Sequence, residues 1–449
     1  MHGGTSMTGK QITEMQTKYV LQSWSKQRGL NPLAISKAEG IYYYDFEGNR
    51  YTDMASQLVN LNVGFGNKEI VDAIKKQADQ YCYLSPALAS EPRAKLAQAI
   101  INKLPDSFGK IFFTNAGADA NENAIKIARL YTGRQKVFSR YRSYHGSTYG
   151  SGNLTGEPRH FALEPAIPGF IHFFDPYIYQ EAIKFKNEKE ATDFYIKKLR
   201  EQIIYEGRDR VAAIEVETIT GSNGIIIPPK GYLQGVRKVC DEFGIVMICD
   251  EVMAGWYRTG KLFSFMNFDV VPDIISFAKG VTCGYVPLGG CIVSKKISSY
   301  FDDNVLSCGL TYSGHPLACA AGLACLKYYD DNQIELHVQK VGKTLGKILE
   351  QLKKSHKCVG DVRYIGLFSA IELVKDKKTR EPLVEYGMDQ QGIMGKIVGE
   401  LKARKFVTYS HENMIMVSPP LIITNEQIIE EMKKMDEVLS IVDAKYLKS

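Results

Sequence analysis

The sequence contains no run of about 20 apolar residues, the length that a membrane-spanning helix requires. Residues 1–10 are polar and glycine-rich, and no apolar stretch typical of a signal peptide occurs there. We therefore predict a cytoplasmic protein without a membrane partner. Residues 1–6, ahead of Met7, are interpreted as vector sequence and take no part in the fold prediction.

Metal-binding patterns and strong charge are absent as well. The nine cysteines form no Cys-x-x-Cys pair and the eight histidines form no cluster, so the sequence predicts no metal site. Lysine and arginine number 56 against 50 aspartates and glutamates, and the excess is dispersed along the chain. Nucleic acid is therefore not expected as a partner. Cys249, Cys291, Cys319 and Cys325 lie in apolar runs, which is typical of core residues in a reducing compartment.

The composition is typical of a globular protein with a large core, since 45% of the 449 residues are hydrophobic and 24% are charged. Between residues 105 and 295, short β-rich runs alternate with helical patterns. The runs lie at 110–114, 136–139, 211–216, 245–249, 273–277 and 290–293, and clear helical patterns lie at 119–131 and 230–243. Several runs lack polar alternation, as strands covered on both faces do. We therefore predict an α/β fold whose mostly parallel central sheet carries helices on both faces.

The pattern changes along the chain and predicts three parts. Residues 65–328 are predicted to form the large domain. Residues 329–449 are predicted to form a small α+β domain, with helices at 333–354 and 425–442 and β-like runs at 366–374 and 414–417. Residues 1–64 are expected to form an N-terminal segment, irregular or antiparallel from residue 31, that packs with the small domain.

Ligands of an open parallel sheet bind beyond the carboxyl ends of its strands, so the residues after each run are the candidate site. Gly117 lies between a run and a helix, where backbone N–H groups can bind a phosphate, although such a turn can also be purely structural. Asp250 ends a buried run and needs a cationic partner, such as a protonated pyridine nitrogen, or is a helix cap. Lys279 is either a nucleophile with a lowered pKa or an exposed lysine at a strand end.

Taken together, six blocks resemble the class III (ω-type) aminotransferases, which use pyridoxal 5′-phosphate (PLP). Among them are YRSYHG (141–146) and DIISFAKGVTCGYVPLGG (273–290), and the others cover 112–129, 212–233, 248–263 and 311–324. They follow the order and spacing of the family over essentially residues 30–445. The resemblance implies the fold type I of PLP enzymes, with a large cofactor-binding domain, a small C-terminal domain and a homodimer that shares its active sites. Pairing of dimers into tetramers is left open.

The resemblance also implies roles for individual residues. Lys279 would bond to the cofactor and move the substrate proton, and Asp250 would keep the pyridine nitrogen protonated. Tyr144 and Val252 would lie on the two faces of the cofactor ring. The phosphate would be bound by the amides of Gly117 and Ala118 and by Thr311 of the neighbouring subunit. His145 and Glu217 would lie close to the cofactor. The sequence departs from the family pattern at three places. It has Ala116 where the family has a serine, Asp119 where the family has a glutamate, and GWYRTG at 255–260 where the family has GFGRTG. None of these departures removes a catalytic role.

The substrate is harder to predict. At the position of the arginine that binds a carboxylate in many relatives, this sequence has Tyr409, and Arg159 is the candidate replacement unless it is a surface residue. The pocket loop, with Leu58 and Val59, lacks the tryptophan of relatives that act on aryl amines, and Tyr83 is expected from the partner subunit. Polar side chains at Gln57 and Asn60 would suit a short acidic ω-amino donor of the taurine, β-alanine or 4-aminobutyrate type, with pyruvate or 2-oxoglutarate as acceptor.

Three alternatives remain open from the sequence. A diamine or polyamine aminotransferase would have acidic residues along its pocket in place of a functional Arg159. An aminomutase or decarboxylase of the same family would turn over without an oxo-acid acceptor. A PLP-binding scaffold without activity would not depend on Lys279.

Overall fold

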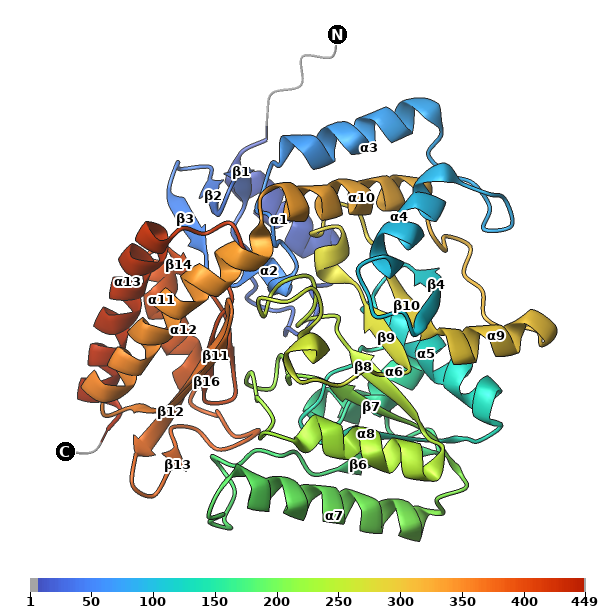
Figure 1. Cartoon of the computed structure of the whole chain (residues 1–449). Helices are drawn as coiled ribbons and strands as arrows, with labels where there is room; N and C mark the ends of the chain where they lie inside the picture. The colour runs from blue at the N-terminus through green and yellow to red at the C-terminus, as the bar shows by residue number, and fades with distance from the viewer. Residues whose placement is uncertain (1–6, 448–449) are drawn as a thin grey trace.

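A seven-stranded sheet forms the centre of the computed structural model, which describes residues 7–447 (Figure 1). Its strands, in spatial order, are β4 (Phe108–Thr114), β10 (Gly289–Ser294), β9 (Ile274–Phe277), β8 (Val246–Asp250), β7 (Val211–Glu217), β5 (Lys136–Arg140) and β6 (Phe170–Phe173). Only β10 runs antiparallel to its two neighbours, and the other pairs are parallel. The predicted α/β architecture is confirmed, and β6 is a strand that the sequence pattern did not predict.

Helices cover both faces of this sheet. On one face, α5 (Gly117–Thr132) shares an apolar cluster with Ala213, Ile248 and Cys291, whereas α8 (Tyr232–Phe243) shares another with Met247 on the opposite face. This division arises because successive side chains of a strand point to opposite faces. The predicted helices at 119–131 and 230–243 are therefore confirmed. Further helices of this region are α3 (Lys68–Gln80), α4 (Glu91–Ile101), α6 (Tyr149–Leu154), α7 (Glu188–Glu206), α9 (Lys295–Asp303) and α10 (Pro316–Asp331).

Strands from the two ends of the sequence form a second sheet. Its strands are β1 (Ile35–Glu39), β2 (Tyr42–Asp45), β3 (Arg50–Asp53) and β14 (Phe406–Val407), and the helices α1 (Gly9–Tyr19) and α2 (Ser56–Val59) flank it in sequence. The first three strands pair antiparallel, while β14 pairs parallel with β3. The Ser56 hydroxyl donates a hydrogen bond to the Ser418 carbonyl over 2.7 Å. The N-terminal strands thus depend on C-terminal residues for their last partner strand.

The remaining C-terminal residues form a third sheet with helices beside it, drawn in orange and red in Figure 1. The strands are β11 (Val359–Ile365), β12 (Phe368–Asp376), β13 (Glu381–Pro382), β15 (Ser410–His411) and β16 (Met414–Val417), and the helices are α11 (Ile334–Ser355), α12 (Ile393–Ala403) and α13 (Asn425–Lys445). A capping box between Thr424 and Gln427 begins α13. The predicted elements near 333–354, 366–374, 414–417 and 425–442 are present, whereas β11 and α12 were not predicted.

The cysteines behave as the sequence indicated. All nine are unpaired, and Cys249, Cys291, Cys319 and Cys325 are completely buried. Within residues 7–447, no helix has both the length and the apolar character needed to cross a membrane. The interpretation of residues 1–6 as vector sequence lies outside the described residues.

Candidate active site

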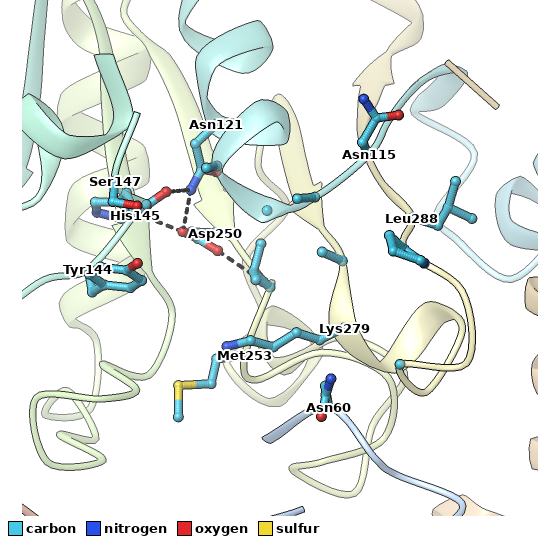
Figure 2. A pocket seen from close by; sticks show the side chains of 18 of the residues that line it. Asn60, Asn115, Asn121, Tyr144, His145, Ser147, Asp250, Met253, Lys279 and Leu288 are labelled. Atoms are coloured by element: carbon cyan, nitrogen blue, oxygen red, sulfur yellow. Dashed lines mark hydrogen bonds and ion pairs between the residues drawn. The ribbon is translucent and has the colours of Figure 1, made fainter. Parts of the chain in front are cut away.

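A cavity of about 370 Å³ opens at the carboxyl ends of the central strands (Figure 2). This volume is in the range of about 300–1,000 Å³ that small-molecule sites have. Among its lining residues are eight of the nine that the family resemblance assigns to the cofactor: Gly117, Ala118, Tyr144, His145, Glu217, Asp250, Val252 and Lys279. They come from distant parts of the sequence and meet because parallel strands end at one edge of the sheet.

Asp250 is the last residue of β8 and is almost completely buried. Its Oδ1 accepts a hydrogen bond from the Val252 amide (2.9 Å), and its Oδ2 lies 2.8 Å from both the Asn121 side-chain nitrogen and His145 Nδ1. These contacts fix the carboxylate at the floor of the cavity. Each carboxylate oxygen has two lone pairs, so Oδ1 keeps the capacity to accept a further donor from the cavity.

Lys279 projects into the cavity from the first turn after β9 (Figure 2). Burial lowers the pKa of its amine, the positive charges of Arg159 and Arg258 lower it further, and Asp250 and Glu217 act in the opposite direction. A lysine with a lowered pKa is more often in its neutral, nucleophilic form. The backbone of Lys279 is in the left-handed region at φ +50°, a strained conformation of the kind that clusters at functional sites.

The N-terminus of α5 borders the same cavity. Its cap residue Ala116 makes no side-chain hydrogen bond to the helix, so the first amides of the 16-residue helix receive no acceptor from their cap. A Cβ atom at Gly117 would lie 2.8 Å from Val252 Cγ1, so only glycine fits between the helix and this side chain. Such a helix terminus binds a phosphate dianion through its amides and its dipole.

Tyr144 lies against the opposite part of the cavity wall. Its amide donates to Glu217 Oε1 over 3.1 Å, and the other oxygen of Glu217 accepts from the Gly221 amide. The guanidinium carbon of Arg159 lies 3.9 Å from the centre of the Tyr144 ring and 5.2 Å from that of Trp24. Arg159 therefore packs against two aromatic rings that also contact each other edge to face, and it lies beside the cavity without being one of its lining residues.

Other predicted residues do not line the cavity. Leu58 is 72% exposed, and Val59 packs in an apolar cluster with Tyr409. Tyr83 donates its hydroxyl hydrogen to the Thr311 carbonyl over 2.9 Å, and both residues are exposed. The roles assigned to these five residues stay predictions.

The two polar residues predicted for the pocket loop lie in different places. Asn60 lines the cavity, whereas Gln57 donates its side-chain amide to Asp53 and is absent from the lining. Its backbone has a positive φ of +59° within the short helix α2. Gln57 therefore contributes no polar group to the cavity wall.

Sequence reasoning also missed several residues that shape the site. Trp24 lies in a segment without periodicity, and Ser222, which accepts a hydrogen bond from Arg159 over 3.1 Å, lies in a glycine-rich loop. Asn121 is one turn into α5 and reaches Asp250. Its polar character inside an apolar helix face was the available signal.

Comparison with known proteins decides the family. Residues 24–439 match the family model described as Aminotransferase class-III. The chain belongs to this family. It is therefore a PLP-dependent aminotransferase.

Individual class III enzymes resemble the chain over almost its whole length. A taurine:2-oxoglutarate aminotransferase from Bifidobacterium kashiwanohense, solved in complex with PLP and glutamate, superposes with a TM-score of 0.96 at 51% identity, covering 99% of this chain and 100% of that one. A taurine–pyruvate aminotransferase from Bilophila wadsworthia is 33% identical, over 97% and 98% of the two chains. A putrescine–pyruvate aminotransferase from Pseudomonas aeruginosa is 32% identical, over 88% of each.

The cavity of this class III enzyme fits PLP in its chemistry. The uncapped start of α5 suits the phosphate, Asp250 can accept a hydrogen bond from the ring nitrogen, and Lys279 offers an amine. When bound, PLP supplies an aldehyde carbon that reacts with amines and a ring system that accepts the electron pair released at the substrate carbon. The neutral Lys279 amine can take a proton from that carbon and return one. These capacities together are those that transamination needs.

Proposed function

We propose that this enzyme takes its amino group from a short ω-amino acid, taurine foremost, and gives it to a 2-oxo acid such as 2-oxoglutarate or pyruvate. The position of Arg159 above Tyr144 carries this proposal, because it places a guanidinium group beside the cavity. The names of the Bifidobacterium and Bilophila enzymes, which both specify taurine as donor, support the same substrate class.

Arg159 is suited to bind the acidic end of the donor. Its Nε is ion-paired with the buried Glu157 and its Nη2 donates to Ser222, while Nη1 has no hydrogen-bond partner within residues 7–447. The bonds to Glu157 and Ser222 and the two aromatic rings hold the guanidinium in place before substrate arrives. A fixed guanidinium can then donate to a sulfonate or carboxylate oxygen at a low entropic cost.

In the same proposal, Lys279 is the base that moves the substrate proton and Asp250 keeps the ring nitrogen protonated. Gly117 and Ala118 bind the phosphate through their amides, and Tyr144 and Val252 enclose the ring. His145 and Glu217 support these groups from behind, since His145 contacts Asp250 and Glu217 accepts from the Tyr144 amide.

The partner subunit completes the site in this proposal. Tyr83 and Thr311 are exposed, bonded to each other and outside the cavity of their own chain. We assign them to the active site of the second subunit of a homodimer, with Thr311 at the cofactor phosphate. The nine unpaired cysteines support a cytoplasmic location, because a reducing compartment keeps thiols free.

A half-reaction without acceptor tests the donor class. We expect taurine, and to a smaller extent β-alanine or 4-aminobutyrate, to bleach the visible absorbance of the bound cofactor when each is mixed with the holoenzyme. Putrescine should leave the band unchanged, because Arg159 would repel an ammonium group. Bleaching by putrescine alone would instead make the enzyme a diamine aminotransferase. Continued turnover of a donor without oxo acid would indicate an aminomutase or decarboxylase.

The Arg159→Ala variant tests the anion site. Losing a charge-assisted hydrogen bond to the donor should lower kcat/KM for taurine roughly 10- to 100-fold, mainly through KM. Arg380→Ala is the matched control, because Arg380 also stacks on a tyrosine, Tyr179, and donates to its carbonyl. Tyr179 does not line the cavity, whereas Tyr144 and Ser222, which Arg159 contacts, do. Equal effects of both changes on KM, measured by steady-state kinetics, would show that Arg159 is only a surface residue.

A further inference from the structure

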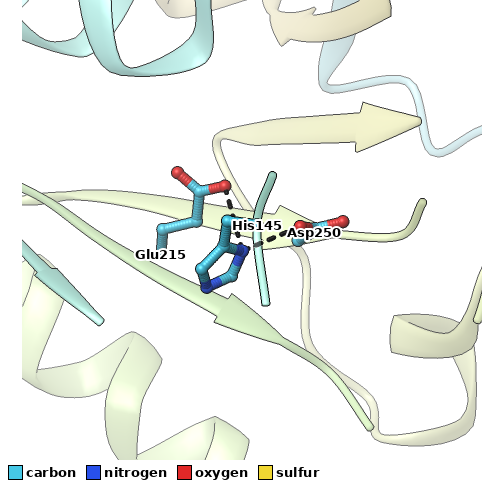
Figure 3. A group of neighbouring side chains, drawn as sticks. All are labelled: His145, Glu215 and Asp250. Carbon is cyan, nitrogen blue, oxygen red and sulfur yellow. Dashed lines mark hydrogen bonds and ion pairs between the residues drawn. The ribbon is translucent and has the colours of Figure 1, made fainter. Parts of the chain in front are cut away.

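Behind Asp250, a second carboxyl group lies in the interior of the molecule (Figure 3). Glu215 is in the middle of β7, two residues after Ala213 of the apolar cluster on α5, and its side chain is completely buried. Neither oxygen of Glu215 has a hydrogen-bond partner within residues 7–447. An unsatisfied buried polar group destabilises a fold by about 1–3 kcal/mol. A buried carboxyl group without partners, next to the apolar cluster on α5, therefore indicates a role other than packing.

His145 connects Glu215 to the cofactor site. Its Nδ1 lies 2.8 Å from Asp250 Oδ2 and 3.6 Å from Glu215 Oε1, whereas its Nε2 is buried without a partner in the described chain. Figure 3 shows the imidazole between the two carboxyl groups. A proton on Nδ1 is therefore favoured by both carboxyl groups, and a proton on Nε2 by neither.

We propose that Glu215 is a positioning residue for transamination: with His145 it keeps a proton on Nδ1, so that His145 donates its hydrogen bond to Asp250 across the working pH range. The pair holds one proton more than an ionised glutamate and a neutral imidazole would hold. This proton is either on Glu215, beside a neutral imidazole, or on His145 as imidazolium, beside a carboxylate. In both arrangements the net charge is the same and Nδ1 keeps its own proton.

The electrostatic surroundings support a retained proton. Burial raises the pKa of Glu215 to about 8, with Asp250 acting in the same direction and His145 against it. Burial alone would lower the pKa of His145, but the hydrogen bond to Asp250 and the charge of Glu215 raise it overall. The ionisable groups that face the pair are Asp250 of β8, Glu217 of β7, Glu122 of α5, Cys291 of β10 and His172 of β6.

The same three side chains offer ligand atoms for a metal ion, since these atoms lie within 4.8 Å of one another. The 2.8 Å contact between His145 and Asp250 argues for a proton instead. Two ligands bound at about 2.0 Å to a tetrahedral ion lie about 3.3 Å apart, which is longer than this contact. A hydrogen bond matches the observed distance.

The test is the pH dependence of the visible absorbance of the holoenzyme, which reports charge at the cofactor independently of turnover. In Glu215→Gln, we expect the midpoint of this titration to move by about one pH unit or more. A shift of one unit corresponds to about a tenfold change in that protonation equilibrium. We also expect kcat to fall while KM for the donor stays the same, because Glu215 lies behind Asp250 and does not line the cavity. Combining E215Q with His145→Asn should add little to H145N alone, because Glu215 acts through His145.

Glu251→Gln is the matched control, because Glu251 is equally buried and has a pKa raised by burial to about 7. Within residues 7–447 it accepts hydrogen bonds only from Thr218, Ser264 and Phe265. E251Q should leave the midpoint of the absorbance titration unchanged. An unchanged midpoint in E215Q, or equal shifts in both variants, would overturn the proposal, as would stoichiometric zinc bound by the purified protein through His145.

A measurement on the unaltered holoenzyme tests the proposal even if the Glu215 variant does not fold. Nitrogen NMR of labelled histidine, assigned with H145N, should show a protonated Nδ1 on His145 between about pH 6 and about pH 8. A proton on Nε2 alone would overturn the proposal. The inference rests on the assignment of Asp250 to the ring nitrogen, and the Asp250 variant described below fails separately if that assignment is wrong.

Discussion

Replacing Lys279 with alanine is expected to abolish turnover, with kcat lower by about 10⁴-fold or more. A positioned general base contributes about 10²–10⁴-fold, and Lys279 is in addition the amine that we assign to the covalent link with PLP. No other lysine lines the cavity in the part of the chain that the structure describes. The measurement is steady-state kinetics with saturating PLP, together with the visible spectrum, which should lose the band of the covalently bound cofactor.

An exposed lysine provides the control for this experiment. Lys295 follows β10 and forms an ion pair with the exposed Asp106, so Lys295→Ala should leave kcat close to the unaltered value. Partial recovery of the Lys279→Ala variant by a small added amine would support the role as proton carrier. Full activity without Lys279 would exclude the proposed mechanism and leave the scaffold interpretation open.

The Asp250→Asn variant is expected to lose about 10³-fold in kcat, the second largest effect. Asparagine has almost the same shape and can keep the contact with the Val252 amide, but it has no negative charge to hold a proton on the ring nitrogen. Without that proton, the electron pair released at the substrate carbon is poorly accommodated. Single-turnover kinetics of the donor half-reaction would isolate this step from acceptor binding.

The neighbouring Glu251 distinguishes a charge effect from a folding effect. It is buried beside Asp250, but its hydrogen bonds in the described part of the chain come only from Thr218 and from backbone amides. Glu251→Gln should therefore lower the melting temperature, at a cost of about 1–3 kcal/mol, with kcat nearly unchanged. Asp250→Asn should also lose some stability, because an amide nitrogen in place of Oδ2 would face the donors of Asn121 and His145, but its fall in kcat should be far larger. A loss of stability in D250N as large as the loss in E251Q, with a comparable kcat, would show that Asp250 is structural.

Much of the central sheet could be predicted because its strands are buried on both faces. The strand Val246–Asp250, for example, is apolar without alternation up to its last residue, and polar residues or glycines mark the ends of such runs. The strand β6 (Phe170–Phe173) escaped prediction because it is four residues long and includes a histidine. The helix α12 follows a segment without a helix-start signal other than Gly392, which is left-handed at φ +62°.

Site residues could be predicted where a reactive side chain comes directly after a β-strand, and less well elsewhere. Asp250, Glu217 and Lys279 meet because the topology of parallel strands requires it. Trp24 reaches Arg159 only through a long irregular segment, for which no periodic rule exists. Glu215 was visible as a charge inside an apolar run, a signal that physical reasoning alone should take as unusual. Contacts with a second subunit could not be predicted, because the order of helices and strands along one chain does not indicate which residues face another chain.

The parallel pairing of β3 with β14 has a consequence for biosynthesis. Thr52 and Asp53 pair with Phe406 and Val407, so the edge of the N-terminal sheet has no partner until nearly the whole chain has left the ribosome. At about 5–20 residues per second, the delay between the two strands is roughly 20–70 s. During that time β3 presents open backbone hydrogen-bonding groups that can template aggregation. Residues 406–407 thus complete the N-terminal sheet, and a nascent chain stalled before residue 406 should be a substrate for chaperones.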